Sequence, residues 1–181
     1  MMKIRRSLVY IASLGLLASA AAHVATFLGV NPKRAMPSVM VLHLLTFIVG
    51  IPAAFMARKA CAKDDPWSFW GIITRHAPLW MKVLPMVLLP YSFFNFFHTS
   101  FVLNQRGVPS TSLGLKALVS HGKVIRRLTD EEYERHQAYS VRGYSGHWML
   151  FYAVAMTVLY SLAKEGAGRD VDSAAQAAFP T

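Results

Sequence analysis

The sequence predicts an all-α integral membrane protein whose four transmembrane helices form an antiparallel bundle. Of its residues, 54% are hydrophobic and only 15% are charged, whereas a soluble domain usually has about 25% charged residues. A helix rises about 1.5 Å per residue, so about 20 apolar residues cross a bilayer. Stretches of this length without Asp, Glu, Lys or Arg cover residues 8–30, 37–57, 83–103 and 146–163.

The first two spans are expected to form a hairpin. The first resembles a signal peptide, but its apolar run continues to Val30, beyond the roughly 7–15 residues of a signal core, so we expect an uncleaved span. Asn31-Pro32 is a helix stop and leaves a short connection to the second span. Pro37 suits the first turn of that span, and Pro52 predicts a kink within it.

The second and third spans are separated by an aromatic segment over residues 67–80, which also contains Arg75 and His76. This composition is typical of a helix lying among the lipid head groups. The third span contains Pro85 and Pro90, followed by a cluster of aromatic residues.

Residues 104–145 form the one sizeable extramembrane insert that the sequence predicts within a single membrane domain over 1–163. Short β-branched runs around a His-Gly pair predict a hairpin, and a Thr followed three residues later by Glu predicts a capped helix. The expected elements are strands at 117–120 and 124–127, a turn at His121-Gly122, a helix from Thr129 to about Tyr139, and a loose tail over 164–181.

The formal charge of +10 lies in the loops and ends, where Lys and Arg meet anionic lipid head groups, so we expect a bilayer and no nucleic acid as partner. Lys3, Arg5 and Arg6 precede the first span and favour an inside N-terminus, and four spans then place the C-terminus inside. We expect a multi-pass protein of the prokaryotic cytoplasmic (inner) membrane. Cys61 is the only cysteine, which excludes an internal disulfide framework and a multi-cysteine metal site.

Three spans each carry one histidine at a similar predicted depth. His23, His43 and His98 are expected roughly 8–10 Å below one membrane face, and His147 opens the fourth span on that side. Ionisable residues within spans are rare because hydrocarbon solvates them poorly. The three histidines also share helix faces with small or polar residues, which predicts that they point between helices.

Three interpretations of this histidine cluster remain open. The imidazoles could bind haem b or a copper or zinc ion, with Thr46, Asn95 and Thr99 orienting the rings. They could instead form interhelical hydrogen bonds, or a proton path. We favour the hydrogen bonds, because a diheme bundle uses histidine pairs at two depths and this sequence offers one depth.

The sequence contains no catalytic constellation, so we expect a protein without catalytic activity of its own. Its small size and abundant aromatic span residues favour a non-catalytic subunit or accessory protein, packed against a larger membrane protein or a second copy. The alternative is a haem b or metal-binding electron-transfer subunit that uses the four histidines. A proton-coupled carrier ranks last, because no span contains an acidic residue.

Overall fold

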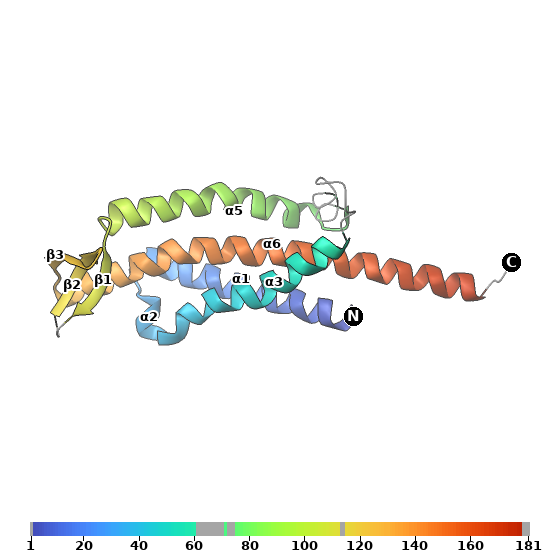
Figure 1. Ribbon diagram of the computed structural model, residues 1–181, viewed down its shortest axis with the longest axis horizontal. Coiled ribbons are helices and arrows are strands. Elements are labelled where there is room, and N and C mark those ends of the chain that lie inside the picture. Colours follow the sequence, from blue (N-terminus) through green and yellow to red (C-terminus); the bar gives the residue numbers. More distant parts are fainter. Residues whose placement is uncertain (1, 61–70, 72–74, 113–114, 179–181) are drawn as a thin grey trace.

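The computed structural model describes residues 2–60, 71, 75–112 and 115–178, which are mostly helical with a small sheet at one end (Figure 1). Within these residues, four helices are long and apolar enough to cross a membrane, as predicted. Both termini lie at the end away from the sheet (Figure 1). The candidate spans are Ile4–Phe27, Pro37–Ala60, Leu79–Leu103 and Asp130–Gly166.

Helix α1 (Met2–Phe27) ends three residues before the predicted boundary at Val30, because a glycine stops it. Gly29 has a φ of +76°, a left-handed conformation that glycine adopts without steric strain. The N–H of Val30 then donates to the carbonyl of Ala25 at 3.0 Å. This closing bond and the left-handed glycine form a Schellman motif, which turns the chain out of the helix.

The connection to the second span is short but helical. Asn31 caps helix α2 (Pro32–Ala35), and its side chain accepts a backbone N–H of the first turn. The 3₁₀ turn η1 (Pro37–Met40) leads into helix α3 (Val41–Ala60). Pro37 thus lies in the first turn of the second candidate span, as predicted. Pro52 lies inside α3.

Helix α5 (Leu79–Phe97) contains Pro85 and Pro90 and continues as a π-helix, η2 (His98–Leu103). Together they end at the residue that the sequence predicted for the third span. Half of the predicted interfacial segment 67–80 lies outside the described residues, and its last two residues open α5.

Three antiparallel strands, in the order β1-β2-β3, form the sheet: β1 (Val108–Ser112), β2 (Leu115–Ser120) and β3 (Lys123–Arg127). The predicted hairpin is confirmed as β2 and β3, joined at His121-Gly122. Strand β1 was not predicted, because its sequence Val-Pro-Ser-Thr-Ser has no alternation of apolar and polar residues.

Helix α6 (Asp130–Ala178) begins with the predicted capping box. The backbone N–H of Thr129 donates to Glu132 Oε2 at 2.9 Å, and the N–H of Glu132 donates to Thr129 Oγ1 at 3.2 Å. The expected short helix to Tyr139, followed by a separate span at 146–163, is wrong, because one continuous helix covers both. The same helix extends to Ala178, so most of the expected loose tail 164–181 has a helical backbone.

The sequence suggested a break because Gly143 and Gly146 lie between the two predicted helices. In the structure these glycines allow α5 to approach closely. A Cβ at Gly146 would lie 2.9 Å from Asn95 Nδ2, and a Cβ at Gly143 would lie 3.3 Å from Thr99 Cγ2. Contact with α5 therefore stabilises the helix where local propensity alone is unfavourable.

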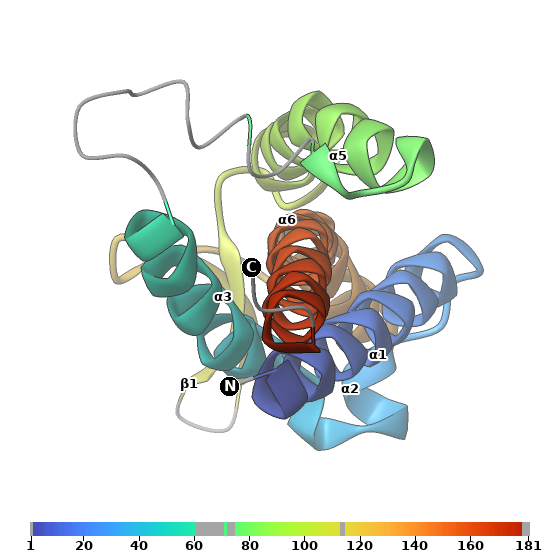
Figure 2. The same ribbon diagram turned by 90° about the vertical axis from the view of Figure 1, so that its right-hand side faces the viewer.

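Helix α6 is the central element, and α1, α3 and α5 each pack against it. Figure 2 shows α5 above α6, α3 to its left and α1 to its lower right. The most apolar window of α6 is 72% buried, against 17–28% for the other three helices. The core consists largely of α6 side chains such as Trp148, Tyr152 and Leu159, which neighbouring helices cover.

We expect Gly15→Ala to destabilise the protein by about 1–3 kcal/mol, the usual cost of overpacking. A Cβ at Gly15 would overlap the ring of Tyr152, whose hydroxyl donates to the Leu42 carbonyl. Gly50→Ala is the matched control, because no atom lies within 4 Å of that Cβ position. Thermal unfolding in detergent measures both, and equal melting temperatures would contradict the predicted contact.

Candidate functional site

His23 is buried between three helices and uses both ring nitrogens. Its Nδ1 lies 2.7 Å from Ser145 Oγ, and its Nε2 lies 2.5 Å from Tyr91 Oη. Ser145 has one hydroxyl hydrogen, which it donates to the Arg142 carbonyl at 3.1 Å. The Nδ1–H of His23 is therefore the donor to Ser145, and Nε2 accepts from Tyr91. This hydrogen-bond chain crosses from α5 through α1 to α6 and leaves no ring nitrogen open to a metal.

His43 is half-buried and joins α3 to α6. The indole N–H of Trp148 donates to His43 Nδ1 at 3.0 Å, so the proton of a neutral His43 ring is on Nε2. The rings of Phe47 and Tyr144 flank the imidazole, with centroids 5.5 and 6.3 Å away. Nε2 of His43 is a hydrogen-bond donor with no protein acceptor among the described residues.

The other two predicted histidines lie among aromatic rings. His98 stacks on Phe94 with centroids 5.8 Å apart. His147 has its Nδ1 3.3 Å from the Gly143 carbonyl, and its ring meets the edges of Phe93 and Phe96.

The three residues predicted to orient the histidines have other contacts. Thr46 donates to the carbonyl of His43 and not to its ring. Asn95 donates to the Arg142 carbonyl of α6 at 2.7 Å. Thr99 is buried, and its hydroxyl has no hydrogen-bond partner in the described part of the chain.

In the described part of the chain, no group of three or more His, Cys, Asp or Glu side chains is placed to hold a metal ion. His23 and His43 instead join their helices to α6, within one turn of each other at Ser145 and Trp148. The predicted haem b or metal site stays a prediction that these contacts do not support.

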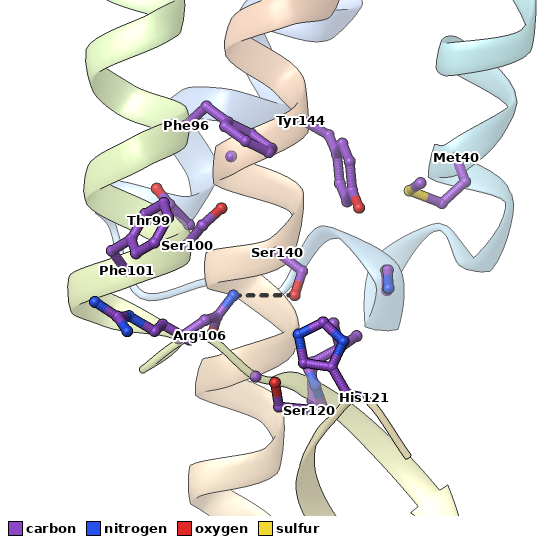
Figure 3. A pocket seen from close by; sticks show the side chains of 16 residues that line it. Met40, Phe96, Thr99, Ser100, Phe101, Arg106, Ser120, His121, Ser140 and Tyr144 are labelled. Carbon is purple, nitrogen blue, oxygen red and sulfur yellow. Dashed lines mark hydrogen bonds between the residues drawn. The ribbon is translucent and has the colours of Figure 1, made fainter. Parts of the chain in front are cut away.

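A cavity of about 890 Å³ lies where η2, α6 and the sheet meet (Figure 3). Tyr144 and Met40 lie at one end of it, and Ser120 and His121 at the other (Figure 3). The sequence did not suggest this site, because its lining comes from seven separate helices and strands. The polar side chains that line it are Lys33, Thr99, Ser100, Asn104, Arg106, Ser120, His121, Ser140 and Tyr144.

The cavity is basic. Lys33 and Arg106 both line it, and its lining contains no Asp or Glu. Lys33 Nζ donates to Gln137 Oε1 at 2.6 Å, and partial burial lowers the pKa of Lys33 from its ordinary value. The Arg106 guanidinium lies 5.3 Å from the ring centroid of Phe101. From the sequence alone, both cations contribute only to the positive charge of the loops.

Comparison with protein-family models, curated proteins and solved structures finds no match to this chain. The candidate function therefore rests on the residues and contacts described above.

We expect His23→Leu to lower the free energy of unfolding by about 1–3 kcal/mol, because it removes the imidazole that hydrogen-bonds to the buried hydroxyl of Ser145. His98→Leu is the control, because its imidazole stacks on Phe94 and makes no hydrogen bond within the described residues. Thermal unfolding in detergent compares the two variants. A larger loss for His98→Leu would show that the hydrogen-bond chain through His23 is not the stronger constraint.

Proposed function

We propose that the protein is a small non-catalytic membrane subunit or accessory protein, which packs within a larger membrane assembly through the outer face of α5. The observation that carries this proposal is an apolar seam on that face, facing away from α6. Its members are exposed and follow one another at intervals of four and three residues: Val83, Val87, Pro90, Phe94, Phe97 and Phe101.

Intervals of four and three keep one helix face directed toward a partner helix. The opposite face of α5 carries Ser92 and Asn95, which are buried against α6. Phe94 and Phe97 are 69% and 53% exposed, so the largest side chains of α5 point away from the protein.

The sheet supports the same proposal from outside the candidate spans. Val108 pairs with Val119, and Val119 pairs with Val124, so three valines cross one face of the sheet in a row. Val108 and Val124 are 63% and 58% exposed. An exposed apolar row of this kind on an extramembrane sheet is typical of an interaction surface.

The alternative function, a haem b or metal-binding electron-transfer subunit, requires a free nitrogen on each ligating histidine, and among the described residues no group of three or more His, Cys, Asp or Glu side chains is placed to hold a metal ion. Tyr91 and Ser145 occupy both nitrogens of His23. We therefore expect the purified protein to show no Soret band in its visible spectrum and no stoichiometric metal. A haem spectrum that His23→Leu abolishes would overturn the subunit proposal in favour of this alternative.

We expect Phe94→Ala with Phe97→Ala to reduce assembly in the native membrane, because the variant loses two aromatic anchors. Leu14→Ala with Leu17→Ala is the control, since both leucines are 66% exposed on α1. Blue native electrophoresis after mild solubilisation measures the size of the assembly. The α1 variant should keep the wild-type size, and the α5 variant should move to the size of the single chain.

A photo-reactive amino acid in place of Phe97 tests the contact directly. One discrete protein adduct supports the proposal, and an adduct of twice the chain mass identifies the partner as a second copy. Adducts with lipid alone, at Phe97 as at Leu14, would contradict it.

A further inference from the structure

We propose that the basic cavity binds the anionic head group of a chain-bearing amphiphile, whose hydrocarbon chain lies along α6 between α3 and α5. This inference goes beyond the proposed assembly function and uses a different face of the protein. Four features support it: uncompensated charge, local backbone geometry, an adjoining apolar groove, and a histidine between the two hollows.

The charge of the cavity is not neutralised within the protein. Lys33 and Arg106 take part in no ion pair among the described residues, whose salt bridges join other cations to Asp130, Glu131 and Glu132. Both cations lie at the sheet end of the candidate spans, where lipid head groups are expected. Basic pockets between membrane helices at this level are suited to phosphate-bearing head groups.

The backbone around the cavity has conformations that are uncommon away from functional sites. Gln105 and Arg106 have φ values of 51° and 61°, and Arg106 lines the cavity. The π-helix η2 contributes Thr99, whose buried hydroxyl has no partner among the described residues. Left-handed non-glycine residues and π-helical turns both concentrate at ligand sites.

An apolar groove of about 330 Å³ lies between α3 and α6, farther from the sheet. Gly50 and Ala54 line it from α3, and Phe151 and Val158 line it from α6. At about 100° per residue, Ser140 and Tyr144 of the cavity lie on the same face of α6 as these groove residues. A chain leaving the cavity along this face therefore enters the groove.

His43 lies between the two hollows. Its ring contacts Tyr144, which lines the cavity, and Phe47, which lines the groove. Because Trp148 occupies Nδ1, the Nε2–H remains available to an oxygen near the head group. The hydrogen bond from Trp148 thus presents a donor at the boundary between the polar and apolar parts of the site.

The head-group test uses delipidated protein and native mass spectrometry with phosphatidylglycerol or phosphatidylcholine of identical chains. We expect preferential binding of phosphatidylglycerol, and a loss of about tenfold or more in Lys33→Gln with Arg106→Gln. Arg34→Gln with Arg127→Gln removes the same charge at exposed positions outside the cavity and should stay within about twofold of wild type. Equal loss in both variants, or equal binding of phosphatidylcholine, would overturn the proposal.

The chain test uses Gly50→Leu, which fills the groove. Binding of the long-chain lipid should fall several-fold, while a six-carbon-chain phosphatidylglycerol should bind as it does to wild type. Ala21→Leu, an exposed position on α1, is the control and should change neither. Unchanged long-chain binding to Gly50→Leu would overturn the role of the groove.

Competition with inorganic phosphate separates a lipid from a free phosphate. We expect phosphate alone to displace the lipid only weakly, and displacement at equal concentration would identify a free-anion site and overturn the amphiphile. Arg106→Gln alone keeps the test decisive if the double variant does not fold, because Arg106 is exposed and its guanidinium lies over the ring of Phe101. Wild-type affinity in that variant would contradict the proposal.

Discussion

The hydrogen-bond chain from Tyr91 through His23 and Ser145 to the Arg142 carbonyl is the constraint on which the rest of the structure depends. Polar groups among apolar side chains are costly unless they are paired, and lipid offers no substitute for a lost partner. Pairing them fixes the depth and rotation of α1 and α5 relative to α6. The bond from Trp148 to His43 does the same for α3.

These hydrogen bonds explain why α6 is the central helix. Each of its three neighbours hydrogen-bonds to it within residues 142–148, and small residues in the same turns allow close approach. His23 and His43, two of the four histidines that suggested a cofactor site, therefore join helices. Nearer the sheet, Lys33 and Arg106 make a cavity basic.

The arrangement leaves two different surfaces available at once. The seam of α5 faces away from α6, whereas the cavity and groove follow the face of α6 between α3 and α5. The two proposed interactions therefore do not compete for the same side chains, apart from Phe101 at the rim. A subunit that contacts a partner through α5 can hold an amphiphile beside it, and each interaction is accessible to separate substitution.

The sequence by itself determined the four apolar helices, the hairpin β2–β3 and the capping box at Thr129, because each depends on residues close together in the chain. It did not predict that Gly143 and Gly146 continue α6, because that depends on α5 packing against them. The partners of His23 and the cavity around Arg106 likewise were decided only by the tertiary structure. Depth in a membrane follows from position along a span, but the direction and partner of a side chain depend on contacts between residues far apart in sequence.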